Sequence, residues 1–199
     1  MVQRYLDNIK PLDDKNYQGL NVKINDIFKE QILEDVYKYE FSSLYANLLV
    51  KFYRRGYLPN VDESIINRVS KYLENPDTVE KGWVIRLYIS ELSGQTTFLF
   101  DLYGQYMRQF YEEIFKSGDI VYIDTDFFIT RKEIDISEIM LDHTKTEVTY
   151  FWMSGRKRYI MYENGIKTMG LKQGSEALLS VEGLIKKRIR TKKLSSILD

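Results

Sequence analysis

Two aspartates placed one position apart, Asp124 and Asp126, are the residues of this sequence best suited to chemistry. They separate two short runs rich in β-branched and aromatic residues, 120–123 and 127–130, and this pattern predicts a β-hairpin with both carboxylates at its tip. Like charges at a turn cost stability, whereas hard cations such as Mg²⁺ prefer carboxylate oxygens as ligands. An Asp-x-Asp turn alone is most simply an acidic surface turn, so the neighbouring segments have to decide between the two interpretations.

A third carboxylate, Glu40, stands where a strand-like run gives way to a helix. Residues 36–41 favour a strand, and from 42 to 53 apolar residues recur at helical spacing. A catalytic site that binds two metal ions needs carboxylates from separate strands, which hold the ions about 3.5–4 Å apart. Glu40 and the hairpin aspartates meet that requirement if their strands are neighbours.

These two segments resemble the two acidic motifs in the palm of family B DNA polymerases. Residues 39–45 (YEFSSLY) are similar to the first motif, D-F-x-S-L-Y-P, and residues 122–126 (YIDTD) are similar to the second, Y-x-D-T-D-S. Weaker similarities extend the resemblance over roughly residues 17–172. They are a Y-x-G-G-x-V-like segment at 17–22, a long helix leading into the hairpin, and a K-x-Y-like strand within 156–165.

The resemblance implies a site for template-directed nucleotidyl transfer that uses two Mg²⁺ or Mn²⁺ ions. Glu40 and Asp126 would ligate the ions, with Asp124 as a supporting acid, and these three are the expected catalytic residues. The expected nucleotide-binding residues comprise the start of the helix, the tyrosine that packs on the deoxyribose and a cation of the fingers: Ser42, Ser43, Leu44, Tyr45 and Arg86. The expected contacts with DNA near the primer end are made by Lys157, Arg158 and Tyr159.

A cluster of cations lies near the end of the sequence, with six in positions 186–193. One interpretation is a solvated helix end, whose negative dipole favours cations. The other is a phosphate-binding surface beside the palm, which would make DNA binding fall steeply with salt. The second interpretation adds four residues to the expected DNA contacts: Lys186, Lys187, Arg188 and Arg190.

The sequence also departs from the family. Glu40 stands where aspartate is usual, and Phe127 stands where serine is usual. An extra methylene moves a carboxylate by about 1 Å, which can cost about 10²-fold in rate. The resemblance includes neither an exonuclease domain nor a thumb of normal size.

Two functions therefore stay open at this point. The first is a minimal DNA polymerase that uses primed DNA template and dNTPs and relies on a partner protein for thumb, priming or processivity. The second is a catalytically degenerate palm that binds DNA and helps to assemble a replication complex. An unrelated α+β protein is a third alternative.

The composition excludes several other classes. With 29 cationic and 29 anionic residues the net charge is zero, so any affinity for nucleic acid depends on how the charge is distributed. The absence of cysteine excludes disulfides and thiolate metal sites, and the single histidine excludes a multi-histidine site. No apolar run of about 18 residues occurs, so we expect no membrane contact. The expected setting is the cytoplasm, for a viral or plasmid-encoded protein.

Helical and strand-like segments are segregated along the chain, which predicts an α+β fold. The resemblance makes this a palm-like antiparallel sheet backed by helices, with a short helical fingers insertion. Further helices are expected at 62–73, 77–92, 97–116, 134–141 and 175–189, and further strands at 21–24, 148–153, 158–162 and 167–171. The expected domains are a palm of 1–60 and 95–172, reduced fingers of 61–94 and a basic C-terminal helix and tail of 173–199.

Overall fold

The structure is a computed structural model that describes residues 23–58, 61–75, 105–112, 114, 119–124, 126–137, 141–170 and 176–198. The Y-x-G-G-x-V-like segment, the expected helix at 77–92 and Arg86 lie outside them, as does the larger part of the expected fingers region. The expected division into domains stays a prediction.

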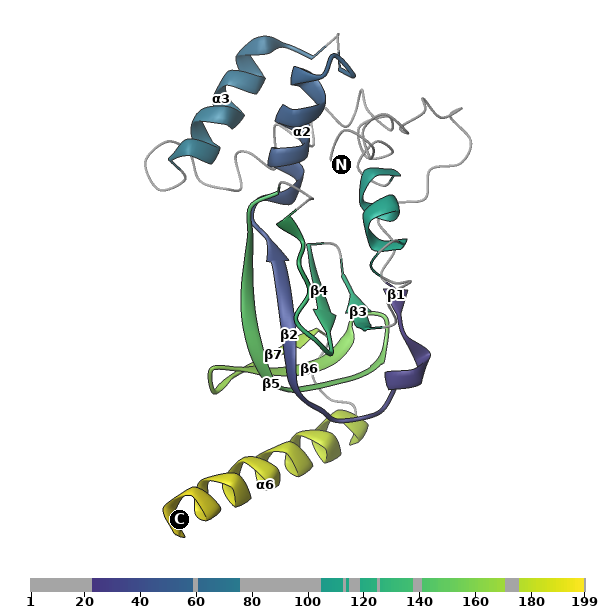
Figure 1. Cartoon of the computed structure of the whole chain (residues 1–199), viewed down its shortest axis with the longest axis vertical. Helices are drawn as coiled ribbons and strands as arrows, with labels where there is room; N and C mark the ends of the chain where they lie inside the picture. Colours follow the sequence, from purple (N-terminus) through teal and green to yellow (C-terminus); the bar gives the residue numbers. More distant parts are fainter. Residues whose placement is uncertain are drawn as a thin grey trace.

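The core of the fold is an antiparallel sheet of seven strands in the order β1-β3-β4-β2-β5-β6-β7 (Figure 1). The strands are β1 Lys23–Ile24, β2 Leu33–Phe41, β3 Ile120–Ile123, β4 Phe127–Thr130, β5 His143–Gly155, β6 Arg158–Glu163 and β7 Ile166–Gly170. The predicted hairpin is the β3–β4 pair, and β2 lies in the middle of the sheet. The prediction of an α+β, palm-like fold with an antiparallel sheet is therefore confirmed.

Helices pack against the end of the sheet where β2 finishes (Figure 1). α2 (Leu44–Arg54) follows β2 almost directly, α3 (Glu63–Glu74) packs beside α2, and residues 105–112 form a further helix. α3 begins where the sequence predicts, because the side chain of Asp62 accepts a hydrogen bond of 2.8 Å from the N–H of Ser64. These three helices contribute buried residues to one apolar cluster with the sheet.

Phe128 lies at the centre of this first cluster, which we call the helix-side cluster. Its side chain is fully buried, and its ring stacks on Tyr39 with the centroids 5.0 Å apart. Phe110 and Tyr111 of the third helix meet the same ring edge-on at 5.9 and 6.0 Å. Aromatic contacts of this kind stabilise beyond their buried area, so the ring couples the hairpin to the helices.

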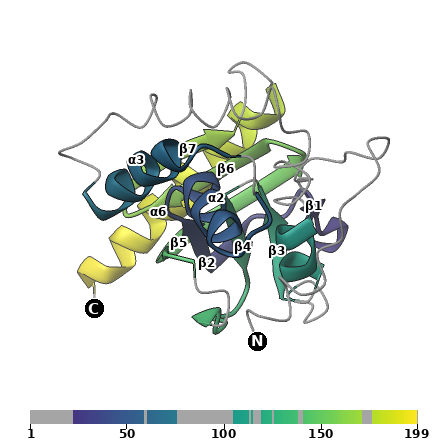
Figure 2. The same ribbon diagram turned by 90° about the horizontal axis from the view of Figure 1, so that it is seen from above.

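The sheet is curled rather than flat. β3 and β6 are separated by three strands, yet the rings of Tyr122 on β3 and Tyr159 on β6 have centroids 5.4 Å apart. The hydroxyl of Tyr122 also accepts a hydrogen bond of 3.0 Å from the backbone N–H of Lys157. Register irregularities in the β5–β6 pairing bend these strands, as β-bulges do. Viewed from above, β5 and β6 turn away from the direction of β2 and β4 (Figure 2).

The concave side of the curled sheet, which we call the concave face, is lined by a second apolar cluster. Its buried members include Val36, Tyr122, Phe127, Phe151 and Tyr159. The concave face and the helix-side cluster are separated by the sheet itself, so alternate residues of β2 and β4 enter one or the other.

A left-handed residue in β2, Asp35 (φ 52°), changes which side chains share a face. Glu34 forms ion pairs with the C-terminal helix α6 (Glu176–Leu198), whereas Val36 lies on the concave face, although strict alternation would put both on one side. From Val36 onward the alternation is regular. Lys38 therefore lies on the concave face, 5.9 Å from the ring centroid of Phe127, and Glu40 follows on the same face.

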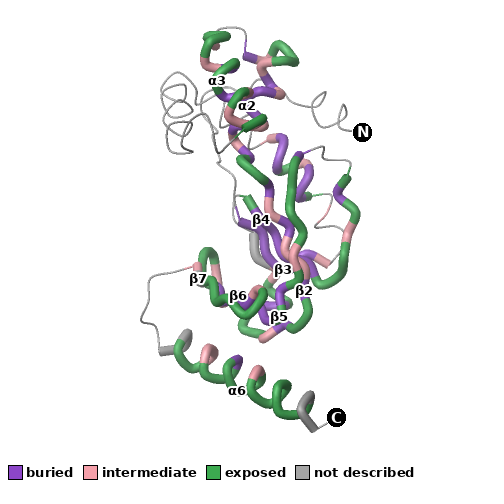
Figure 3. The backbone as a smooth tube through the Cα atoms, turned by 90° about the vertical axis from the view of Figure 1, so that its left-hand side faces the viewer, coloured by how far each residue is buried: buried purple, intermediate pink, exposed green. Residues whose placement is uncertain are grey.

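α6 (Glu176–Leu198) crosses the other end of the sheet, and most of its described surface is exposed (Figure 3). Ile185 is buried against aromatic residues of β5 and β6. Two cations of α6 bind the carboxylate of Glu34, Arg188 at 2.7 Å and Lys192 at 2.9 Å. The helix is longer than the 175–189 expected from sequence. None of the helices in the described part of the chain has the length and apolar character needed to cross a membrane.

We expect Glu34→Gln to loosen α6 without unfolding the sheet. The hydrogen bond from Lys192 lowers the pKa of Glu34 below its usual 4.5 and outweighs the opposing effect of burial. A lowered pKa in the folded state means that this attachment is complete above about pH 4.5 and weakens as the pH falls through the folded value. Both ion pairs are partly exposed, so the loss is about 1 kcal/mol or less.

Hydrogen exchange followed by mass spectrometry is the measurement for this prediction. Amides in α6 should exchange faster in Glu34→Gln while those of β2 and β5 keep their protection. Glu147→Gln, which changes another exposed glutamate, is the control. Equal exchange in α6 of the two variants would mean that the other contacts of the helix, its apolar packing and the ion pair of Glu182 with Lys167 of β7, are sufficient to hold it.

One sequence-based expectation about local structure is wrong. Residues 134–136, at the start of the expected helix 134–141, are not helical. The hydroxyl of Tyr39 accepts a hydrogen bond from the N–H of Ile134 (2.8 Å) and donates one to its carbonyl (3.0 Å). The side chain of Asp135 accepts from the N–H of Ser137 at 2.9 Å. The backbone of Ile134 is therefore bonded to Tyr39, and Asp135 stands in the position of a helix cap, so the chain is not helical before Ser137.

Candidate functional site

The end of β2 and the tip of the β3–β4 hairpin lie side by side. Glu40 is the register partner of Phe127, and the backbone N–H of Phe41 donates to the carbonyl of Asp126 at 2.8 Å. The N–H of Asp124 donates to the carbonyl of Phe127, also at 2.8 Å, and closes the tip. The backbone alone therefore brings the three expected catalytic carboxylates to one end of the sheet.

Lys38, two positions before Glu40, belongs to the same site. Its ammonium group forms an ion pair with Glu40 and a second one, at 3.3 Å, with Glu163 on β6. Burial alone would lower the pKa of Lys38, but the hydrogen bond from its ammonium to Glu40 and the charges of both glutamates outweigh burial and raise it. The carboxylate of Glu40 is thus held by an internal cation.

Asp124 is a buried carboxylate whose position is fixed from several sides. Only 8% of the surface of Asp124 is exposed to solvent. One carboxylate oxygen lies 3.4 Å from the ammonium of Lys157, and the other accepts a hydrogen bond from the hydroxyl of Tyr122 at 3.4 Å. The hydroxyl of Tyr111 donates to the Asp124 carbonyl at 3.4 Å. Asp124 therefore joins the concave face to the third helix.

The carboxylates also interact electrostatically. Burial raises the pKa of Asp126, and the negative charges of Glu40 and Asp124 raise it further. Burial likewise raises the pKa of Tyr159 to about 12, with Asp124, Asp126 and Glu40 adding to the shift. The fold itself does not require three negative charges at one place, so a turn with a purely structural role would not be expected to bring Glu40, Asp124 and Asp126 together. Such a cluster of carboxylates with a raised pKa is more typical of a functional site.

The donor chemistry of this site fits divalent cations such as Mg²⁺ or Mn²⁺, which take carboxylate oxygens as ligands. Glu40 and Asp126 are the residues that could hold such an ion, with Asp124 beside them. Within the described ranges no three His, Cys, Asp or Glu side chains converge as a metal-binding group. Lys38 and Lys157 instead contact Glu40 and Asp124. The carboxylates are neighbours, and each of Glu40 and Asp124 is paired with a lysine, the enclosed Lys38 and the exposed Lys157.

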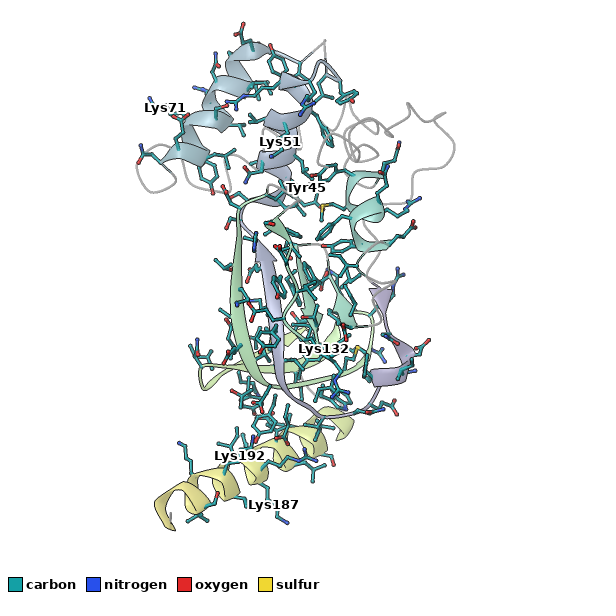
Figure 4. The ribbon with its side chains drawn as sticks, in the orientation of Figure 1. Tyr45, Lys51, Lys71, Lys132, Lys187 and Lys192 are labelled. Carbon is teal, nitrogen blue, oxygen red and sulfur yellow. The ribbon has the colours of Figure 1, made fainter. Side chains whose placement is uncertain are left out.

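The start of α2 carries the described part of the expected nucleotide site. Ser43, the N-cap residue, is left-handed (φ 44°) and makes no side-chain cap, while the N–H of Ser42 donates to the carbonyl of Asp142 at 2.9 Å. Ser42 is therefore already used within the fold. Leu44 is buried, and Tyr45 is half-buried against the helix-side cluster where β2 meets α2 (Figure 4). Binding of a nucleotide by these residues stays a prediction.

The expected DNA contacts on the β5–β6 turn differ in exposure. Lys157 and Arg158 are exposed, but Tyr159 is 8% exposed and packs among the aromatic rings of the concave face. Its ring lies flat against Gly170 of β7, where an added Cβ would come within 2.6 Å of the ring carbon Cδ1. Because Gly170 covers one side of the ring, a primer strand could contact Tyr159 only at the part of the ring that faces the carboxylates.

The basic cluster on α6 lies far from the carboxylates. Glu34, which anchors α6, and Glu40 are six residues apart on β2, a distance of about 20 Å at the rise of a strand. Lys187 and Lys192 accordingly lie at the opposite end of the sheet from Tyr45 (Figure 4). All four expected DNA contacts on α6 are exposed: Lys186, Lys187, Arg188 and Arg190. Of these, Lys186 pairs with Glu182 at 2.7 Å and Arg188 pairs with Glu34.

Two residues of the site, Lys38 and Glu163, were not predicted from sequence. The spacing of Lys38 and Glu40, two residues apart on a strand, could have placed both on one face. No local pattern could have revealed Glu163, because it reaches Lys38 only through the pairing of β5 with β6 and the curl of the sheet.

Comparison with known proteins finds a weak structural similarity. No family model and no curated protein matches the sequence. Among solved structures, the chain is similar to the family B DNA polymerase from the hyperthermophilic archaeon Pyrobaculum calidifontis, with a TM-score of 0.39 and 13% identity. The match covers 98% of this chain and 38% of that polymerase, so the chain spans well under half of its length. A similarity this weak leaves the function to be argued from the site.

Proposed function

We propose that this chain is a polymerase-like palm domain that carries out template-directed deoxynucleotidyl transfer on primed DNA. The observation that supports this proposal most directly is the hydrogen bond from the N–H of Phe41 to the carbonyl of Asp126. This bond sets the carboxylate at the end of β2 beside the hairpin tip. A site of this kind needs carboxylates from two separate backbone segments at one point.

In the proposed mechanism, Glu40 and Asp126 would hold the divalent ions, with Asp124 beside them as a supporting acid. The chemistry that bound Mg²⁺ or Mn²⁺ ions supply is activation of the primer 3′-hydroxyl and stabilisation of the leaving pyrophosphate. The amides of Ser43 and Leu44, at a helix N-terminus, favour phosphate oxygens, and Tyr45 provides a surface on which the deoxyribose packs. Lys157 and Arg158 provide exposed cations for the primer strand. A partner protein that supplies thumb, priming or processivity belongs to the same proposal.

A second candidate function is a palm that binds DNA or assembles a replication complex without catalysis. The observation that favours it is the pairing of Glu40 with Lys38 and of Asp124 with Lys157. An ammonium group in contact with a carboxylate reduces the negative potential that attracts a divalent ion. The two functions differ in whether nucleotide is incorporated, not in whether DNA is bound.

Primer extension separates these candidates. The polymerase proposal expects template-dependent extension that requires Mg²⁺ or Mn²⁺ and that disappears on chelation. The binding proposal expects retention of primed DNA in a gel-shift experiment, with no incorporation under single-turnover conditions with either metal. Extension that ignores the template sequence would contradict both.

We expect Glu40→Asp to lower the rate of primer extension by about 10²-fold. The shorter side chain retreats by about 1 Å from a position that the register of β2 and β4 fixes, and misplacement on that scale carries a cost of this size. Single-turnover rates with saturating dNTP are the measurement. Glu147→Asp, on the neighbouring strand β5, is the matched control and should leave the rate unchanged. A faster Glu40→Asp enzyme would mean that the glutamate itself is the defect.

A further inference from the structure

Lys38 occupies a position with two alternative carboxylate partners. Its ammonium group pairs with Glu40 at the end of β2 and with Glu163 at the end of β6. The side chains of Lys38 and Glu163 are 13% and 21% exposed, whereas that of Glu40 is 44% exposed. The lysine and Glu163 are therefore enclosed, while Glu40 reaches the surface where a ligand can arrive.

The balance of charge explains why a lysine stands at this position. The carboxylates that gather here are Glu40, Glu163, Asp124 and Asp126, and the cations that contact them are Lys38 and Lys157. Partly buried like charges are costly unless they are paired. Lys38 removes much of that cost, because one ammonium group serves two glutamates from different strands.

We propose that Lys38 is a built-in counter-cation that competes with a divalent ion for Glu40 and stays with Glu163 when Glu40 turns toward the hairpin aspartates. The inference rests on the proposed function, since a divalent ion is the ligand that this function implies. In this exchange Glu40 changes rotamer, and Lys38 keeps the contact with Glu163 that it already makes. Lys38 is thus a positioning residue that acts through Glu40.

The test is Mn²⁺ binding by the protein without DNA or nucleotide, followed by electron paramagnetic resonance of free Mn²⁺. Lys38→Met removes the competing charge and keeps an unbranched apolar stem, and it should raise the affinity for Mn²⁺ about tenfold. Glu163→Gln removes the charge of the second carboxylate, so of these two contacts only the one with Glu40 keeps a charged partner for Lys38. Lys38 should then compete more strongly for Glu40, and the affinity for Mn²⁺ should fall about threefold to tenfold. A merely structural role would move both variants in the same direction.

Two controls accompany these variants. Lys38→Arg keeps the cation and should bind Mn²⁺ much as the natural protein does. Lys145→Met breaks a comparable lysine–glutamate pair, Lys145 with Glu133, on an exposed part of β5 and should leave Mn²⁺ affinity unchanged. Thermal denaturation of each variant checks that the fold persists, and the two principal variants test the inference independently of each other.

The outcomes separate this inference from the proposed function. Opposite shifts in Mn²⁺ affinity support the counter-cation, even if no variant extends a primer, in which case the polymerase proposal fails alone. If the protein extends primers but Lys38→Met leaves its Mn²⁺ affinity unchanged, the counter-cation inference fails and the polymerase proposal stands. Absence of Mn²⁺ binding in every variant, or shifts in the same direction, overturns the inference as well.

Discussion

Asp126→Asn is expected to reduce metal-dependent primer extension by about 10³-fold or more while making the protein slightly more stable. The first effect follows because an amide is a poor ligand for Mg²⁺, and the transition-state stabilisation supplied by a bound metal is worth several kcal/mol, or about 10³-fold. The substitution keeps the shape of the side chain. The hydrogen bond from Phe41 to the Asp126 carbonyl involves only backbone and should persist.

The gain in stability follows from the raised pKa of Asp126. Burial and the charges of Glu40 and Asp124 make the folded protein hold the proton of Asp126 more tightly than the unfolded chain does. The charged carboxylate therefore costs stability at neutral pH, and this cost disappears as the pH falls through the raised pKa. Asp126 is only partly removed from water and remains exposed at the surface, where solvent screens its charge, so the cost is only about 0.5 kcal/mol. The neutral amide should therefore raise the Tm by about 1–2 °C in the absence of metal.

The two effects of opposite sign make this prediction specific. Asp142→Asn removes a nearby exposed carboxylate and should change neither the extension rate nor the Tm by a comparable amount. Single-turnover extension and calorimetry in EDTA are the two measurements. An Asp126→Asn protein that is less stable, or that extends primers at the natural rate, would place Asp126 outside the site.

Phe128→Ala should destabilise the fold by about 3–5 kcal/mol, the range found when a large aromatic side chain is removed from a core. Phe128 is completely buried and stacks on Tyr39. It also joins the hairpin to the third helix through Phe110 and Tyr111. The cavity left behind would be lined by aromatic rings that adjust poorly, which favours the upper part of the range.

Urea denaturation followed by circular dichroism measures this loss. Ile27→Ala removes an apolar side chain that is 73% exposed and should change the free energy of unfolding by about 0.5 kcal/mol or less. Similar denaturation midpoints for the two variants would mean that Phe128 is not at the centre of a packed core. Because total stability of a domain is about 5–15 kcal/mol, a loss of the expected size should also reduce the amount of folded protein recovered.

The features that sequence could predict are those that depend on neighbouring residues. The hairpin follows from two short β-rich runs around the aspartates, and the start of α3 follows from Asp62 as a capping residue. Glu40 at the end of a strand was equally visible. Its position beside Asp126 was an expectation from resemblance, and the register of β2 against β4 gives it a physical basis.

The features that sequence could not predict depend on contacts between distant segments. The expected helix at 134–141 fails at its start because Ile134 bonds to the hydroxyl of Tyr39, which is 95 positions away. The curl that brings Glu163 to Lys38 is a property of the whole sheet. Asp35 in a left-handed conformation reverses the alternation of β2, and aspartate tolerates that conformation without requiring it.

The hydrogen bond between Phe41 and Asp126 has a consequence for how this protein acquires its site. The two residues are 85 positions apart, so the carboxylates come together only after a long loop has closed. No fragment containing one of the two segments can assemble the constellation. Pairing between such distant segments is slow, and a nascent chain must therefore be made at least as far as β4 before any chemistry can begin.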